Sequence, residues 1–366
     1  MFIRLADFSE YYVITNILKY VTFRSSCAFF SSIFIVFAFG SKIIDYLNYF
    51  QGCNKKYIQV QDLPIHSEKI GTPIMGGIII LIGLIGSSFL WADLSSIHVI
   101  IILMLTLGFG LVGFYDDYIK ITSGDNRGLS WKFRIIVEFI IATCAVCFLL
   151  FYSSSTFLGL ETTTIISFPF LKNISIDIGL FFIPFASFII VATANAVNLT
   201  DGLDGLAIVP ILIASISFSF IAYITGDIIF SHYLKVNFIP GTGELVVVIS
   251  ALVGAGIGFL WFNAPPASVF MGDTGSLALG ALIGGVAVST KHEITLVIIG
   301  GLFVIEALSV IIQVGYFKIT KKRIFLMAPI HHHFEKKGWT ESQIVIRFWI
   351  IAFILAVIGL LTVNMN

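Results

Sequence analysis

The chain has 366 residues, of which 58% are hydrophobic and only 11% are charged, and its mean hydropathy is +1.00. No water-soluble domain of this length needs so much apolar surface, so the composition predicts a polytopic membrane protein. A formal net charge of zero argues against a nucleic-acid-binding surface, and four scattered cysteines are too few for a disulfide framework.

The apolar runs define the expected elements. The N-terminus lacks a cleavable signal pattern, because Arg4, Asp7, Glu10 and Lys19 interrupt it before an apolar core begins. Beyond it, runs of about 17–25 apolar residues predict ten spans. They lie near residues 22–41, 73–92, 97–115, 133–153, 174–194, 205–225, 245–264, 275–289, 294–317 and 343–363. The expected fold is an all-α polytopic membrane protein, a bundle of about ten transmembrane helices.

Two of these spans are rich in small residues. Gly254-x-x-x-Gly258 marks the seventh span, and Gly280-x-x-x-Gly284 marks the short eighth span. Small residues let membrane helices approach closely, so we expect both spans to lie inside the bundle.

The distribution of Lys and Arg predicts the orientation. With the loops between spans numbered in order, the odd loops hold thirteen cations and the even loops hold three. The thirteen are Lys42, Lys55, Lys56, Lys69, Lys120, Arg127, Lys132, Lys318, Lys321, Lys322, Arg323, Lys336 and Lys337. The positive-inside rule therefore predicts that the odd loops are cytoplasmic and that both termini lie on the opposite face.

Three polar clusters interrupt the apolar pattern. Asp116 and Asp117 end the third span, the segment NAVNLTDGLDGLA (195–207) follows the fifth, and Asp273 precedes the eighth. A charged residue costs roughly 2.5–3.5 kcal/mol at the centre of a membrane helix, so acids at a membrane face usually have a function. The clusters fall in loops 3, 5 and 7, which predicts one polar reaction centre at the cytoplasmic surface.

The chemistry of these clusters favours phosphoryl transfer. Loops 5 and 7 carry carboxylates but contain no Lys or Arg, and such carboxylates suit Mg²⁺, which binds one or two of them plus substrate phosphates. Loops 1, 3 and 9 supply cations through Lys69, Lys132 and the run at 321–323. Acids for a metal and cations for phosphate are the components of phosphoryl transfer, and the location suggests a lipid phosphate as one substrate.

Several motifs together resemble the phospho-N-acetylmuramoyl-pentapeptide transferase family, within the polyprenyl-phosphate N-acetylhexosamine-1-phosphate transferases. They span positions 66 to 335 in the family's order. The motifs are HSEKIGTPIMGG (66–77), GFYDDYIK (113–120), GLSWKFR (128–134), NAVNLTDGLDGLA (195–207), NAPPASVFMGDTG (263–275) and APIHHHFE (328–335).

The resemblance implies a reaction and its partners. Residues 1–366 would form one integral-membrane transferase domain in the bacterial inner membrane, with its active site facing the cytoplasm. UDP-N-acetylmuramoyl-pentapeptide would give its phospho-sugar to undecaprenyl phosphate in the lipid bilayer, with Mg²⁺ as cofactor, releasing UMP. The sequence leaves open whether two copies form a homodimer.

The resemblance also implies residue roles. Asp116 would contact or deprotonate the lipid phosphate, Asp117 would support the site, and Asp273 would hold Mg²⁺. His331 would join these three in catalysis. The substrate-binding residues would be Lys69, Lys132, Asn195, Asn198, Asp201, Asp204, Asn263, Phe270, Gly272 and His332, with Asn263 and Phe270 at the nucleoside.

Each motif also has a structural explanation that involves no substrate. Asx-Gly sequences such as those at 201–205 make tight turns, and Asp273 is placed to cap the helix that follows it. Lys69 and Lys132 could be positive-inside anchors. Glu306 lies inside a span, where a buried hydrogen bond is as good an explanation as catalysis, and Glu138 near a span end needs no special account.

Two alternative functions remain at this stage. One is a related enzyme that transfers N-acetylglucosamine-1-phosphate to a polyprenyl phosphate, although the intact APIHHHFE segment favours the muramoyl donor. The other is a secondary transporter, although transporters place their acids near the midplane of the membrane and show inverted repeats.

Overall fold

The computed structural model describes residues 2–3, 5, 13–53, 71–123, 128–155, 164–167 and 175–363. Within these ranges, nine helices are long and apolar enough to cross a membrane, and a further apolar helix, α2, is shorter. The chain is therefore an all-α polytopic membrane protein, as its composition predicts. The predicted substrate-binding residue Lys69 lies outside the described residues.

The long helices follow the predicted spans in order. They are α1 (Val21–Cys53), α2 (Gly77–Trp91), α3 (Ile97–Ser123), α4 (Trp131–Ser155), α6 (Phe182–Thr200), α7 (Ile208–Gly226), α9 (Leu245–Asn263), α10 (Gly272–Ser289), α12 (Gly301–Thr320) and α14 (Glu341–Val363). The short elements are η2 (Val13–Lys19), β1 (Ile165–Ser167), β2 (Ser175–Asp177), η4 (Gly179–Phe181), α8 (Ile228–Leu234), η5 (Thr242–Glu244), α11 (Glu293–Ile299) and α13 (Ile330–Lys336).

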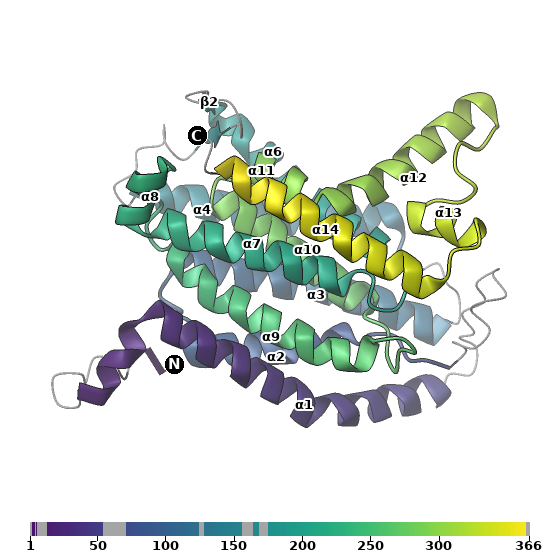
Figure 1. Cartoon of the computed structure of the whole chain (residues 1–366), viewed down its shortest axis with the longest axis horizontal. Helices are drawn as coiled ribbons and strands as arrows, with labels where there is room; N and C mark the ends of the chain where they lie inside the picture. Colours follow the sequence, from purple (N-terminus) through teal and green to yellow (C-terminus); the bar gives the residue numbers. More distant parts are fainter. Residues whose placement is uncertain are drawn as a thin grey trace.

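The helices run up and down, so that α1 begins and α14 ends at the same end of the bundle (Figure 1). This agrees with an even number of crossings. The loops that carry the three polar clusters consequently lie together at the opposite end.

Helix α10 occupies the centre, as its small residues predict. In its apolar stretch 89% of the residues are buried, and it packs against α3 and α6. A Cβ added at Gly280 would lie 2.6 Å from the Cα of Ala194 on α6, so the two backbones are in direct contact. The hydrophobic effect does not hold helices together inside lipid, so such close packing is what stabilises the bundle.

Four predicted boundaries are wrong. Helix α1 continues past 41 to Cys53, so Lys42 lies within it. Helix α3 continues past 115 to Ser123, so Asp116 and Asp117 lie within its last turns, where an i,i+4 ion pair between Asp116 and Lys120 supports the helix. The span expected at 174–194 begins only at Phe182, because β2 pairs with β1 in an antiparallel hairpin before it. The span expected at 294–317 is divided into α11 and α12 at Gly300, next to a second glycine, both of which disfavour a continuous helix.

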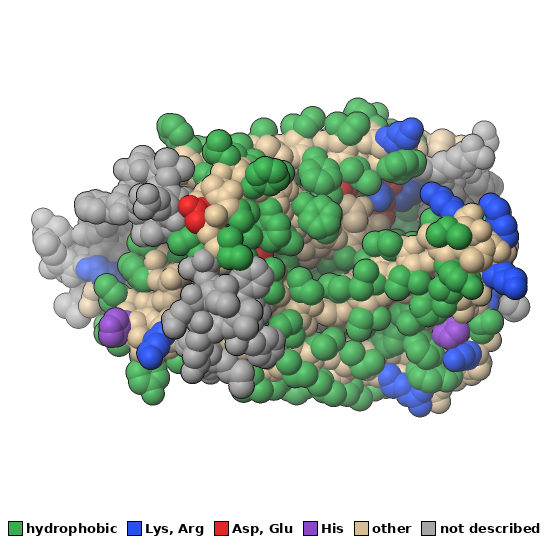
Figure 2. Space-filling model, turned by 90° about the horizontal axis from the view of Figure 1, so that it is seen from above, with side chains coloured by type: hydrophobic (Ala, Val, Ile, Leu, Met, Phe, Trp, Pro, Cys, Tyr) green, Lys and Arg blue, Asp and Glu red, His purple; other side chains and the backbone are tan. Residues whose placement is uncertain are grey.

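The surface is consistent with a bilayer environment. Figure 2 shows hydrophobic side chains over most of one face, with Lys and Arg gathered at the end where α12 and α13 meet. Helix α12 extends away from the other helices before the chain returns through α13 to α14 (Figure 1). The cationic run at 321–323 follows the end of α12 and is exposed.

Candidate active site

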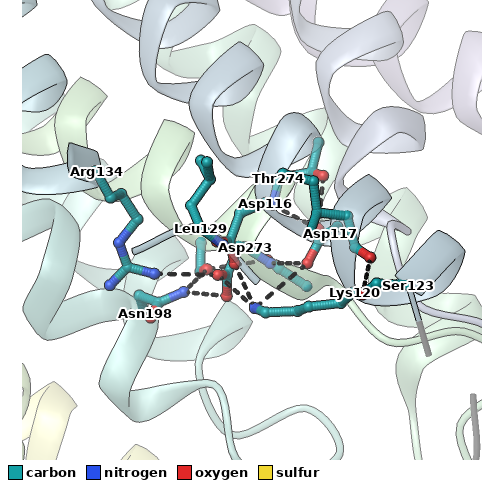
Figure 3. A network of polar contacts seen from close by, with 12 residues as sticks. Asp116, Asp117, Lys120, Ser123, Leu129, Arg134, Asn198, Asp273 and Thr274 are labelled. Carbon is teal, nitrogen blue, oxygen red and sulfur yellow. Dashed lines mark hydrogen bonds and ion pairs between the residues drawn. The ribbon is translucent and has the colours of Figure 1, made fainter. Parts of the chain in front are cut away.

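Three carboxylates meet at the end of the bundle where the polar clusters lie. Asp116 and Asp117 come from α3, and Asp273 comes from the first turn of α10 (Figure 3). One oxygen from each residue lies within 4.8 Å of the others. Asp116 and Asp117 are almost fully buried, whereas Asp273 is partly accessible. Residues 157 positions apart in the chain thus form one acidic cluster.

Glycines make this approach possible. A Cβ at Gly113 of α3 would lie 2.1 Å from the carbonyl oxygen of Asp273, and one at Gly77 of α2 would lie 2.2 Å from the nitrogen of Gly275. The first turn of α10 can therefore lie between α2 and α3 only because neither position carries a side chain. Gly272 has a φ of +73°, and a Cβ there would lie 2.8 Å from a carboxylate oxygen of Asp117.

Asp117 caps α10 from the neighbouring helix. Its carboxylate accepts hydrogen bonds from the backbone nitrogens of Thr274 (3.0 Å) and Asp273 (3.3 Å) and from the Thr274 hydroxyl (2.7 Å). These are N–H groups at the helix start, which have no partner within the helix, and a negative charge there is favoured by the helix dipole. Asp117 therefore ties the start of α10 to α3.

Asp273 does not cap its own helix, which removes the structural explanation considered above. Its side chain faces the cluster instead and accepts a hydrogen bond from the Asn198 amide at 2.6 Å. The same carboxylate contacts Lys120 at 2.8 Å and Arg134 at 3.2 Å. The expectation that the carboxylate of loop 7 is free of cations is wrong, because α3 and α4 supply two.

Lys120 is the central cation of the cluster. Its Nζ lies 2.5 Å from Asp116, 2.8 Å from Asp273 and 4.0 Å from Asp117 (Figure 3). The other oxygen of Asp116 accepts a hydrogen bond from the backbone nitrogen of Leu129 at 2.6 Å. This last contact ties the segment before α4 to α3.

Arg134 is held by a second network. Its guanidinium contacts Asp273 and donates to the side-chain amide oxygen of Asn195 at 3.2 Å. It also lies 3.6 Å from Glu138, one turn later on α4. Glu138 is fully buried and accepts a hydrogen bond from the Asn195 amide at 2.6 Å. Our interpretation of Glu138 as unremarkable is therefore wrong, since it orients both the arginine and the asparagine.

Asp201 lies beside the cluster. Burial, together with the charges of Asp273 and Asp117, raises the pKa of its carboxyl group to about 8. Asp204 is directed elsewhere, because its carboxylate accepts from the backbone nitrogen of Ala267 at 3.2 Å. The two aspartates of this turn thus have different surroundings.

Asn263 holds the same loops together. Its amide accepts from the backbone nitrogen of Gly205 at 3.0 Å and donates to the carbonyl of Val269 at 2.9 Å. Phe270 is half-buried, and its backbone pairs with Pro73 and Gly76 before α2. Asn263 and Asp204 therefore join the loop after α6 to the loop before α10.

Lys132 is another predicted site residue that does not contact the carboxylate cluster. It is exposed at the start of α4, where its Nζ lies 5.8 Å from the ring of Trp131. Among the described residues, the cations in contact with the carboxylate cluster are Lys120, from the motif at 113–120, and Arg134, from the motif at 128–134.

The histidines approach the site from α13. His331 is buried, and its Nδ1 lies 3.2 Å from the Glu306 carboxylate of α12. A Cβ at Gly202 would lie 2.3 Å from the Nε2 of His331, so this ring packs directly against the turn that carries Asp201. His332 contacts Glu335 at 2.5 Å instead.

A comparison with known families completes this description. The model of the family described as glycosyl transferase family 4 matches residues 99–291, more than half of the chain and most of the site. The chain belongs to this family. It is therefore a membrane-embedded phospho-sugar transferase of the polyprenyl-phosphate hexosamine-1-phosphate transferase superfamily.

The site of this family member fits a hard divalent metal. Carboxylate oxygens are the ligands that Mg²⁺ prefers, and Asp116, Asp117 and Asp273 each present one within 4.8 Å of the other two. Asn198 and Arg134 hold Asp273 from the side away from Asp117 (Figure 3).

Sequence reasoning overlooked four contributors: Lys120, Arg134, Glu138 and Thr274. Three of them carried a signal, because Lys120 follows Asp116 by four residues and Glu138 follows Arg134 by four, and such pairs meet on one helix face. Thr274 carried no comparable signal.

Proposed function

We propose that this protein transfers phospho-N-acetylmuramoyl-pentapeptide from its UDP-linked donor to undecaprenyl phosphate. One observation carries the proposal. The motifs at 113–120, 128–134, 195–207 and 263–275 converge at one end of the bundle, and the APIHHHFE motif joins them where His331 packs on Gly202. The transporter alternative loses its basis, because the acids gather at one end of the helices and not midway along them.

The chemistry is a displacement at phosphorus. An oxygen of the lipid phosphate forms a bond to the phosphorus that carries the sugar, the bond from that phosphorus to the UMP oxygen breaks, and UMP leaves with the electron pair. Most of the catalysis in such a reaction comes from positioning and from neutralising charge. Bound Mg²⁺ would supply Lewis-acid stabilisation of the phosphate oxygens, held by Asp273 with Asp116 and Asp117 close by.

The side chains of the site would divide the remaining work. Arg134, fixed by Glu138 and Asn195, presents a rigid guanidinium beside Asp273 and suits a phosphate oxygen. Asp116 would orient the lipid phosphate and accept its proton. Asp201 and His331 line the turn where the donor's sugar phosphate would bind.

We favour direct attack over a phospho-enzyme intermediate. Direct attack requires both substrates together, whereas a covalent route lets the donor react alone. Mixing the enzyme with donor and no lipid in a single-turnover experiment should give no UMP. A stoichiometric burst of UMP, with a phospho-sugar left on the protein, would make one of the aspartates a nucleophile.

The experiment that tests the function is UMP release from purified enzyme, with and without Mg²⁺. Undecaprenyl phosphate is offered with either UDP-N-acetylmuramoyl-pentapeptide or UDP-N-acetylglucosamine. We expect turnover of the muramoyl donor alone and only with the metal present. Turnover of UDP-N-acetylglucosamine in its place would assign the chain to the related enzyme.

We further propose that the site faces the cytoplasm from the bacterial inner membrane. The support is the thirteen-to-three excess of cations in the loops at this end. A cysteine replacing the exposed Ser123 should react with a membrane-impermeant maleimide in inverted vesicles and be protected in intact spheroplasts. The opposite pattern would reverse the orientation.

A further inference from the structure

Lys120 occupies the point at which the three carboxylates converge. Its ammonium group lies within 4.0 Å of an oxygen of Asp116, of Asp117 and of Asp273. These are the residues that could hold a metal ion in the described part of the chain. A metal bound to carboxylates sits about 2.0–2.1 Å from their oxygens. The ammonium group and a metal ion therefore cannot occupy this point at the same time.

The charges explain why a cation is needed there without a metal. Three carboxylates lie together, and two of them are almost fully buried. Neighbouring like charges in such surroundings repel one another and favour protonation. Arg134 reaches only Asp273, so Lys120 is the cation that contacts all three acids among the described residues.

The two cations differ in how firmly they are held. Arg134 is fixed on several sides, because Asn195 and Glu138 contact its guanidinium. Lys120 lies in the last turn of α3, and the ion pairs described for its ammonium group are all with the carboxylates themselves, while its stem lies beside Gly128. Its ammonium is a compact charge on a flexible stem, and a fifth of its side chain is exposed, so it can leave by rotation of that stem.

We propose that Lys120 is an internal counter-cation, which holds the three carboxylates together in the metal-free protein and is displaced when a divalent metal binds. The proposal rests on the proposed function for its metal. It assigns Lys120 a positioning role, since the side chain keeps the three carboxylates together until the metal takes its place. Lys120 then competes with the metal for the ligands that both of them use.

The test measures metal binding without substrates. Mn²⁺, a spectroscopic substitute for Mg²⁺, is titrated into purified protein and the free ion is followed by electron paramagnetic resonance. Lys120→Gln and Lys120→Met remove the competing charge, so we expect each to bind Mn²⁺ about tenfold more tightly or better. Lys120→Arg keeps the charge and should show no such gain. Lys318→Gln, which removes an exposed cation on α12, is the matched control and should bind like the unmodified protein.

Thermal unfolding gives an independent readout. A ligand that binds only the folded state stabilises it in proportion to the logarithm of its affinity. Adding Mg²⁺ after EDTA should therefore raise the Tm of Lys120→Gln more than that of the unmodified protein. A Lys120 variant that stays folded only with Mg²⁺ present would support the same conclusion, because the metal then supplies the missing cation.

The outcomes separate this inference from the proposed function. If Mn²⁺ binding is lost in Asp273→Asn but Lys120→Gln binds no more tightly than the unmodified protein, Lys120 does not occupy the metal's place, and the transferase proposal stands. If Asp273→Asn binds Mn²⁺ normally, the metal is not held at this cluster and both fail. UMP release by the unmodified protein is scored separately from either result.

Discussion

Asp117→Asn is the substitution whose effect the structure defines best. Asp117 receives three hydrogen bonds from the start of α10, from Thr274 twice and from Asp273 once. An asparagine of the same shape keeps one acceptor oxygen. Its NH₂ group then points at a backbone N–H, so that two donors face each other, and the remaining bonds change from charged to neutral.

The magnitude follows from those contacts. Hydrogen bonds to charged groups contribute about 1.5–3 kcal/mol each, and roughly half as much when neutral, so the losses come to about 3 kcal/mol. The neutral amide is no longer repelled by Asp273, and this offsets a part of the loss, so the free energy of unfolding should fall by about 2 kcal/mol. With about 2.1 cal/mol/K of unfolding entropy per residue, the Tm should fall by about 3 °C. The fall should be larger if the helices persist on unfolding, because the entropy change is then smaller.

The assay is thermal unfolding in detergent with EDTA, followed by tryptophan fluorescence, with UMP release measured in parallel. Asp273→Asn is the comparison for activity, which should fall by orders of magnitude because an amide binds a hard cation poorly. Lys318→Gln, which removes an exposed cation on α12, is the control for Tm and should unfold like the unmodified protein. An Asp117→Asn protein with normal Tm but no activity would refute the capping role and place Asp117 on the substrate.

Three further experiments test other parts of the site. Asp116→Asn should reduce turnover severely while equilibrium binding of the UDP-linked donor stays near normal. Phe270→Ala should weaken donor binding and reduce turnover less. Weak donor binding by Asp116→Asn would contradict this. Because the pKa of Asp201 is raised from 3.8 to about 8, the folded state keeps a proton that the unfolded state loses, so stability falls as pH rises through this window. In EDTA, the difference between the Tm of Asp201→Asn and that of the unmodified protein should thus increase from pH 5 to pH 8 and stay constant above pH 8. A difference that does not change with pH would be inconsistent with the raised pKa. Glu306→Gln removes the charge beside His331 and should lower kcat about ten- to a hundredfold, and the double variant with His331→Ala should be no worse than His331→Ala alone; additive losses would show that the two act independently.

The sequence by itself determined the class of the molecule and the location of its chemistry. The apolar runs are long enough to cross a bilayer, and their order makes every second loop lie at the same end. Asp116, Asp201 and Asp273 follow or precede such runs in odd loops, so their convergence at one end was predictable from the count of spans alone. The small residues of α10 likewise predicted its central position.

The sequence could not decide which polar groups touch. Counting charges by loop indicated Lys69, Lys132 and the run at 321–323 as the phosphate-binding cations. In the structure, the cations that contact the carboxylates are instead Lys120 and Arg134, among the described residues. A count of charges by loop predicts the end of the bundle at which a residue lies, but it does not predict which neighbouring helix its side chain faces. That direction is set by packing.

Tertiary packing therefore decided the site. Gly77 and Gly113 admit the first turn of α10 between two helices, and this contact brings Asp273 onto Asp117. The same packing buries Glu138 against Asn195, where the Glu138 carboxylate also contacts the guanidinium of Arg134. Span lengths and loop charges are local properties that a sequence displays directly. The meeting of side chains from four helices depends on backbone distances of a few ångströms, which only the folded bundle establishes.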